Sequence, residues 1–191
     1  MLNKFISTAP ARICLFGDHQ DYLQLPIIAC AINRYITIEA IPNQTNTLHI
    51  FKHDLNKEDI IQLNEPVKVV EEDYLRLSLI VLSRYNCVPN QGYDVHISGN
   101  IPINSGLSSS SALTVAWVQF LIHAFGINET ISPMLIAKLA HEIEVIEQNT
   151  SGGKMDQYTI SLGNRIYMDT KTDAITTFTN KLNGMIVGDS G

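Results

Sequence analysis

A run of apolar residues from Ser111 to Phe125 constrains the fold more than any other feature of the chain. At helical spacing this segment is apolar on nearly every side, and a helix without a polar face is normally buried. Gly126 follows directly and is a typical residue to end a helix. We therefore predict a central helix over residues 111–125, around which the other elements pack.

The segment before this helix is rich in glycine and serine. The alternation in Tyr93–Ser98 predicts a half-buried strand that leads into Pro102–Ala112. A helix start leaves backbone N–H groups without partners and carries partial positive charge, so it favours an anion. Gly106 lets the backbone approach a phosphate closely, and the hydroxyls of Ser108 to Ser111 can bond phosphate oxygens or ligate Mg²⁺. The segment lacks the common P-loop pattern, and an ordinary serine-capped helix start is the alternative interpretation.

Short strands and a few helices alternate along the rest of the chain. We predict strands over residues 12–16, 27–41, 47–52, 93–98, 165–168, 174–178 and 184–188. Further helices are predicted over residues 71–85, 133–148 and 155–162, the second with Ser132 as its N-cap and Pro133 as its first residue. This mixture predicts an α+β domain rather than a doubly wound parallel sheet.

The composition narrows the classes of partner. The chain has 191 residues, a net charge of −6 and no run of Lys and Arg, which argues against nucleic acid because phosphate backbones are bound by basic surfaces. Its three cysteines lie in apolar segments, so we predict reduced, buried thiols. No apolar run approaches the ~20 residues that span a bilayer, and the N-terminus has no signal-peptide core. We expect a cytoplasmic protein without a membrane or nucleic-acid partner.

A polar loop follows the first apolar strand. Asp18, His19 and Asp21 lie within six residues of one another and suit a substrate with many hydroxyl groups. A solvated turn is the alternative interpretation. Arg12 lies inside the preceding apolar segment, where a charged side chain must be paired or functional.

A second group of acidic residues lies in the last third of the chain. Glu142, Glu144 and Glu147 share one predicted helix, and Asp156 follows a flexible glycine pair. Two of the glutamates are expected to form a solvated face. One carboxylate near a triphosphate is a natural Mg²⁺ ligand, and a second that accepts a proton from a substrate hydroxyl completes the minimum for phosphoryl transfer. Asp156 is the better candidate for the second role.

Three segments resemble, in the same order, the signatures of the GHMP kinase superfamily, and sugar kinases of the galactokinase type are the most similar branch. They are residues 10–22 followed by Leu25-Pro26, residues 106–112, and residues 152–157 with Ser161 and Gly163. The first resembles that branch's substrate-binding signature, the second the phosphate-binding motif, and the third the segment that carries the catalytic aspartate. The resemblance implies an ATP- and Mg²⁺-dependent kinase that phosphorylates a sugar hydroxyl, with the anomeric one expected.

The resemblance also implies a role for each matching residue. Asp156 would be the catalytic base, or would orient the attacking hydroxyl, and Arg12 would stabilise it and the transferring phosphate. Mg²⁺ would be coordinated by Ser110 and Glu144. Sugar hydroxyls would be bound by Asp18, His19 and Asp21, with Tyr22 alongside. The phosphates of ATP would be wrapped by Gly106, Leu107, Ser108, Ser109 and Ser110.

The implied domain is the GHMP kinase N-terminal domain, a mixed or antiparallel sheet packed with helices, over residues 1–180. Residues 181–191 would begin a second, C-terminal domain that is largely absent from this sequence, so we expect self-association or association with the missing half. Three departures put galactose itself in doubt. The loop between Tyr22 and Leu25 is shorter than in galactokinases and lacks their usual Asn-Gly-Gly segment. Asp18 stands where galactokinases usually carry Glu, and Lys154 stands where a small or apolar residue is usual; Lys154 is expected to point to water or to contact an anionic group.

Other functions remain open at this point. The same residues would serve a module that binds sugar and ATP without turnover, because a sensor keeps its binding residues. A GHMP kinase for another substrate, such as mevalonate or homoserine, is a further alternative. The polar loop at residues 17–22 favours a polyol over such a small acid.

Overall fold

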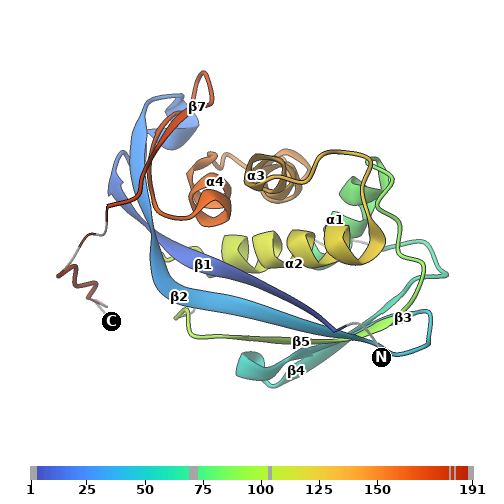
Figure 1. Ribbon diagram of the computed structural model, residues 1–191. Coiled ribbons are helices and arrows are strands. Elements are labelled where there is room, and N and C mark those ends of the chain that lie inside the picture. The colour runs from blue at the N-terminus through green and yellow to red at the C-terminus, as the bar shows by residue number, and fades with distance from the viewer. Residues whose placement is uncertain (1–3, 69–72, 103–104, 181, 183, 189–191) are drawn as a thin grey trace.

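The fold is one sheet covered on one face by helices (Figure 1). The computed structural model describes residues 4–68, 73–102, 105–180, 182 and 184–188. Its strands are β1 (Phe5–Phe16), β2 (Ile27–Pro42), β3 (Thr47–Lys52), β4 (Lys57–Gln62), β5 (Tyr93–Gly99), β6 (Arg165–Asp169) and β7 (Ala174–Phe178). Its helices are α1 (Tyr74–Ser83), α2 (Ser109–Phe125), α3 (Pro133–His141) and α4 (Met155–Leu162), with a π-helical turn at Glu142–Ile146 and 3-10 turns at Asp21–Leu23 and His53–Leu55.

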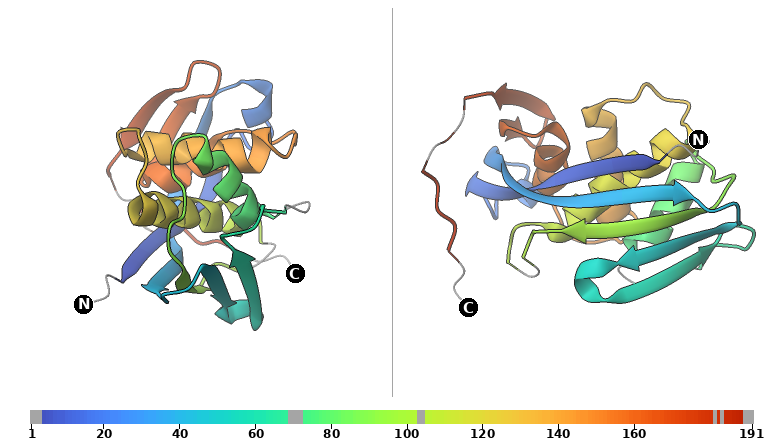
Figure 2. Two further views of the ribbon diagram at one scale, coloured as in Figure 1. Left: turned by 90° about the vertical axis from the view of Figure 1, so that its right-hand side faces the viewer. Right: turned by 60° about the horizontal axis from the view of Figure 1, so that its bottom comes forward.

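The sheet is mixed, one of the two arrangements that the family resemblance implies. The strand order is β4-β3-β5-β2-β6-β7, and β1 pairs with β2 as well. The long strand β2 pairs with β5 through its second half and with β6 through its first residues. Only the β3–β5 pair is parallel among the described strands, and Figure 2 shows β3 and β4 at one edge of the sheet. The α+β prediction is confirmed.

Helix α2 lies at the centre of the domain, as its apolar sequence predicts. It packs on β1 and β2 on one side and on α3 and α4 on the other (Figure 1). Trp117 and Phe120 are at most 1% exposed, and the ring of Phe120 makes edge contacts with those of Tyr93 and Phe125. The burial of this helix places its first turn, and the serine-rich loop before it, at a fixed point beside the sheet.

Replacement of Phe120 by Ala is expected to lower the free energy of unfolding by about 3–5 kcal/mol, because the lost ring leaves a cavity in the core. The same replacement at Phe16, which is 69% exposed, should change stability by less than about 0.5 kcal/mol. Urea denaturation of both variants measures the difference. Equal effects at the two positions would contradict the central place of α2.

Several predicted boundaries agree with the structure and a few do not. The strands at 47–52 and 174–178 and the helix at 155–162 are confirmed, and Ser132 caps α3 by accepting from the N–H of Leu135 at 3.2 Å. The predicted helix 133–148 changes to a π-helical turn after His141. The predicted helix 71–85 runs from Tyr74 to Ser83, its first two predicted residues lying outside the described part. The predicted strand at residues 184–188 is wrong, because that segment pairs with no strand among the described residues.

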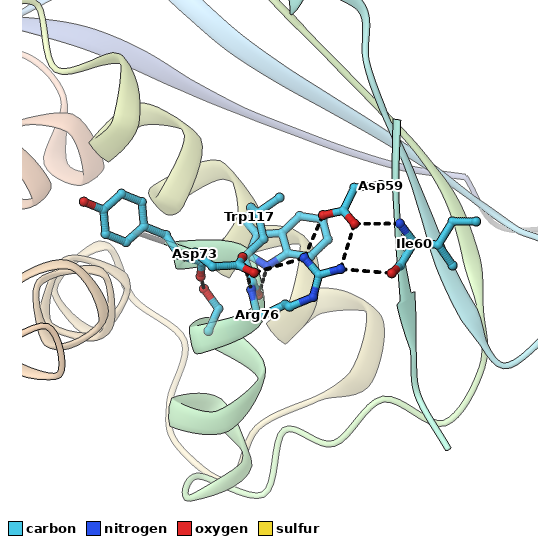
Figure 3. Close-up of polar contacts among 8 residues, drawn as sticks. Asp59, Ile60, Asp73, Arg76 and Trp117 are labelled. Carbon is cyan, nitrogen blue, oxygen red and sulfur yellow. Dashed lines mark hydrogen bonds and ion pairs between the residues drawn. The ribbon is translucent and has the colours of Figure 1, made fainter. Parts of the chain in front are cut away.

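Strand β4 was not expected, and a charged cluster ties it to α1. Both terminal nitrogens of Arg76 in α1 donate to the carboxylate of Asp59 in β4 at 2.7 Å (Figure 3). Arg76 also donates to Asp73 at 3.0 Å and to the carbonyl of Ile60 at 3.0 Å. The hydrogen bond from Arg76 lowers the pKa of Asp59. This edge strand is therefore held by pairing with β3 and by its link to a helix.

Asp59→Asn is expected to destabilise the fold by about 1–2 kcal/mol at neutral pH, because it removes the charged partner of Arg76. Since the pKa of Asp59 is lowered in the folded state, its contribution exists above the ordinary carboxyl value of 3.8 and is lost as pH falls through the lower folded value. Urea denaturation at about pH 7 and about pH 3 should show the difference between wild type and variant shrinking in acid. Asp54→Asn, in an exposed 3-10 turn of the same sheet edge, serves as the control and should show no such trend.

The structure also bears on two expectations from the composition, the state of the cysteines and the presence of a membrane-spanning helix. Cys30 and Cys87 are buried and Cys14 is partly buried, and all three are free thiols. Burial raises the pKa of Cys87 to about 11, as expected of an inert thiol. In the part of the chain that the structure describes, no helix has the length and apolar character needed to cross a bilayer.

Candidate active site

Three elements distant in sequence meet around one guanidinium group. Arg12 lies in β1, Gly106 and Leu107 precede α2, and Asp156 is in the first turn of α4. Arg12 Nε donates to Asp156 Oδ1 at 2.6 Å and Arg12 Nη1 donates to the carbonyl of Gly106 at 2.7 Å. The backbone N–H of Arg12 also donates to the carbonyl of Leu107 at 3.3 Å. Its side chain is 11% exposed, so the predicted pairing of this charge is confirmed.

The second oxygen of the Asp156 carboxylate is bound by Ser108. The Ser108 hydroxyl donates to Asp156 Oδ2, so Arg12 and Ser108 hold the two oxygens of one carboxylate. Ser108 is the N-cap of α2 and adopts a left-handed backbone, with φ of 57°, which is costly for a residue other than glycine. A strained backbone of this kind persists only where the surrounding structure stabilises it, and such residues are often found at functional sites.

The start of α2 has the features of an anion site. The helix has 17 residues, and its own first turn carries no acidic side chain; the carboxylates near it, Asp156 and Glu144, come from other elements. The hydroxyls of Ser109 and Ser110 donate to no group in the described part of the chain. Gly106 has φ of 71° and open space where a Cβ would stand. The Ser109 and Ser110 hydroxyls and the backbone N–H groups of the first turn lie at this helix start, next to the loop that Arg12 contacts; the predicted phosphate-binding role of this loop stays a prediction.

Glu144 lies in a buried polar pocket next to this helix start. It is 7% exposed and accepts hydrogen bonds from Thr114 Oγ1 at 3.0 Å and Gln157 Nε2 at 2.5 Å. Burial raises its pKa, against the lowering effect of hydrogen bonds from Gln157, Ser111 and Thr114. The serine beside Glu144 is therefore Ser111, whereas the predicted partner Ser110 is exposed. The role of Glu144 as a metal ligand together with Ser110 stays a prediction.

The donor chemistry of this pocket fits a hard cation. A carboxylate and hydroxyl groups are the ligands that Mg²⁺ prefers, together with phosphate oxygens. Gln157 Oε1 is buried and has no hydrogen-bond partner among the described residues, so one oxygen beside Glu144 lacks the partner that a buried polar atom requires. No cluster of three His, Cys, Asp or Glu side chains suited to a metal exists in the described part of the chain.

The predicted substrate residues separate into exposed and buried groups. The side chains of Asp18 and His19 are 65% and 85% exposed, and Tyr22 is 51% exposed with its ring edge toward His19. Asp21 is only 8% exposed, and its carboxylate accepts from backbone N–H groups at the start of α4. The exposed three are free to meet a ligand, and their roles in substrate binding stay predictions.

The other charged residues of the region form ion pairs. Glu147 pairs with Arg84 at 2.5 Å, and Glu142 lies 3.4 Å from the same guanidinium, so these two glutamates belong to the surface rather than to the site. Lys154 pairs with Asp173 in the β6–β7 turn at 2.5 Å. The Lys154 side chain is 30% exposed, so the ion pair is partly solvated, and a role of Lys154 toward an anionic substrate group stays a prediction.

Sequence reasoning did not identify which residues line the Glu144 pocket, and it named Ser111 only as one of four serines. Ser111 and Thr114 lie three apart on α2, a spacing that puts them on one helical face. Gln157 was visible in the third motif but received no role. The spacing gave a usable signal for the two α2 residues, but only the packing of α2 against α4 shows that both face Glu144.

Comparison with family models decides the relationship. The model of the GHMP kinases N terminal domain matches residues 73–164, and the galactokinase galactose-binding signature matches residues 2–42. This chain contains a domain of the GHMP kinases N terminal family. The two matches include all three elements of the site. Arg12 lies in the range 2–42, and Ser108, Glu144 and Asp156 lie in the range 73–164.

The relatives of this GHMP kinase domain carry two different names. A mevalonate kinase of Pyrococcus horikoshii is 29% identical over 176 residues, which cover 87% of this chain and 52% of the relative. A galactokinase of Thermotoga maritima is 32% identical over 173 residues, which cover 86% of this chain and 46% of the relative. The crystal structure of Lactococcus lactis galactokinase complexed with galactose has the same fold, with a TM-score of 0.79 at 21% identity, over 91% of this chain and 46% of that one. The GHMP kinase domain thus spans about half the length of the relatives it matches.

Proposed function

We propose that this domain belongs to an ATP- and Mg²⁺-dependent kinase that phosphorylates a hydroxyl group of a sugar, the anomeric one being expected. The observation that carries the proposal is the carboxylate of Asp156, held between Arg12 and Ser108 at the positive end of α2. A proton acceptor, a cation and an anion-binding helix start at one point are the parts that phosphoryl transfer requires.

Each residue acts on a defined part of the reaction. Asp156 orients the acceptor hydroxyl and takes its proton as the hydroxyl oxygen bonds to the γ-phosphorus and the bond from that phosphorus to the ADP oxygen breaks. Arg12 holds Asp156 in place and stabilises the negative charge on the transferring group. The N–H groups of the first turn of α2 and the hydroxyls of Ser109 and Ser110 bind phosphate oxygens.

Mg²⁺ would be held by Glu144, with Ser110 and phosphate oxygens, and when bound it neutralises phosphate charge. Thr114 and Gln157 keep the Glu144 carboxylate in one orientation, through hydrogen bonds of 3.0 and 2.5 Å. These bonds support a metal ligand that is preorganised rather than carried on a mobile side chain.

A neutral polyol is the acceptor that the surrounding charges favour. Asp18 and His19 offer exposed hydrogen-bonding groups on the loop that follows the strand of Arg12. Lys154, the basic residue two positions before Asp156, is paired with Asp173, so it offers no free charge to an acidic acceptor. Kinases of both a sugar and a small acid are among the relatives, and the test must include both classes.

The test is ADP release by the chain with Mg·ATP and a panel of free sugars, mevalonate and homoserine. Turnover with one sugar would support the proposal and identify the acceptor, and turnover with mevalonate or homoserine alone would overturn the sugar assignment. Calorimetric titration with the same panel separates the remaining cases. Sugar binding without turnover would mark a binding module, and the absence of both would contradict the proposal for this chain.

A further inference from the structure

Asp21 lies beneath the start of the helix that carries Asp156. Its Oδ1 accepts from the backbone N–H of Lys154 at 3.0 Å, and its Oδ2 accepts from the N–H of Met155 at 2.8 Å. Both oxygens of a buried carboxylate are therefore occupied by two consecutive N–H groups of the same helix start. A helix leaves such N–H groups without intrahelical partners, and carboxylates bind them well.

The start of α4 has no cap of its own. Lys154 occupies the N-cap position and gives no side-chain hydrogen bond to the helix, whereas Ser132 and Asp73 cap α3 and α1 from the neighbouring sequence. Asp21, which is 133 residues away from Lys154 in the chain, supplies this cap from a distant loop. The contact leaves no space, because a Cβ at Gly153 would lie 2.0 Å from the Asp21 carboxylate.

The loop that carries Asp21 is itself fixed. The Thr170 hydroxyl donates to the carbonyl of Asp21 at 3.3 Å and to that of Leu25 at 3.0 Å. The N–H of Gln24 donates to the carbonyl of Asp21 at 3.1 Å, closing the 3-10 turn. The end of β6 thus holds the backbone of the loop while its carboxylate holds α4.

We propose that Asp21 is a positioning residue, which caps α4 and thereby fixes Asp156, the next residue after Met155. Its catalytic consequence rests on the proposed function, but the cap itself does not. Asp21 is only 8% exposed and each of its oxygens already accepts one backbone N–H, so the capping role is the one that its contacts in this structure support. Asp18 and His19 of the same loop are exposed, so they offer comparison positions without a capping role.

Asp21→Asn, compared with Asp18→Asn, tests the proposal by the same chemical change at a buried and an exposed position of one loop. In Asp21→Asn we expect the amides of Lys154 and Met155 to exchange about tenfold faster with solvent, or about 1.4 kcal/mol of lost protection. We also expect kcat to fall while the acceptor KM stays within about twofold. In Asp18→Asn the exchange rates should not change, and sugar affinity should fall.

The opposite pattern would overturn the proposal: unchanged exchange at Lys154 and Met155 with weakened sugar binding would make Asp21 a substrate ligand. The wild-type chain gives a second test that needs no variant. Amides in the first turn of a helix normally exchange fast, so protection of these two amides supports the cap and its absence contradicts it. Because exchange is measured without substrate, it decides the proposal even if no acceptor is phosphorylated.

Discussion

Asp156→Asn is expected to lower kcat with the acceptor sugar by about 10²–10⁴-fold, the range for loss of a general base. The amide keeps the shape of the carboxylate but accepts no proton from the acceptor hydroxyl. It also meets Arg12 at 2.6 Å and the Ser108 hydroxyl without a charge, so both groups lose their charge-assisted bond. ADP release at saturating Mg·ATP measures the effect.

The control for this experiment is Asp173→Asn, the same chemical change at a carboxylate outside the site. Asp173 pairs with Lys154 on the β6–β7 turn, and its side chain is 43% exposed. The control should keep kcat within about threefold, because exposed ion pairs contribute little. Near-wild-type activity in Asp156→Asn would remove Asp156 from the catalytic role, and sugar affinity measured by calorimetry shows whether binding has survived.

The features that sequence predicts well are those that local chemistry determines. The apolar run at residues 111–125 requires a buried helix whatever surrounds it, and α2 is that helix. Ser132 and Pro133 mark the start of α3 through their own capping chemistry. The meeting of Arg12 with the loop before α2 and with Asp156 follows from three motifs that share one family pattern, and it could be expected without knowing any distance.

The features that sequence misses depend on partners far along the chain. Strand β4 reads as a charged loop because Lys57, Glu58 and Asp59 are consecutive, and its pairing with β3 and its link to Arg76 stabilise it only in the folded state. The segment at residues 184–188 has the apolar character of a strand but pairs with none among the described residues. Tertiary pairing overrides local propensity in both cases.

Positions within the site show the same limit at the level of single atoms. Four consecutive serines are chemically equal, and only the rotation of α2 selects Ser111 to face Glu144. Asp21 has the chemistry of a sugar ligand, but its position 133 residues from Lys154 in sequence and 3.0 Å in space turns it toward a helix start. Motifs therefore predict which residues gather at the site, and the packing decides what each one touches.

Arg12→Lys is expected to lower kcat by about 10²–10³-fold, the range for removal of one preorganised donor. Arg12 donates through two nitrogens in fixed directions, to Asp156 Oδ1 and to the carbonyl of Gly106. A lysine ammonium keeps the charge but is a single point without the planar fork, so it cannot serve both acceptors in this geometry. Arg34→Lys, an exposed position on β2, is the matched control and should leave kcat unchanged.

Arg12 also joins β1 to the loop before α2, so a loss of activity in Arg12→Lys has two possible origins that temperature separates. If the residue acts only through stability, activity should recover on cooling in proportion to the folded fraction given by circular dichroism. We expect instead that kcat stays low at temperatures where the variant is fully folded, because the misplaced charge raises the barrier in the folded enzyme. Recovery to the wild-type kcat on cooling would assign Arg12 a structural role and leave the transferring phosphate to the helix start and the metal.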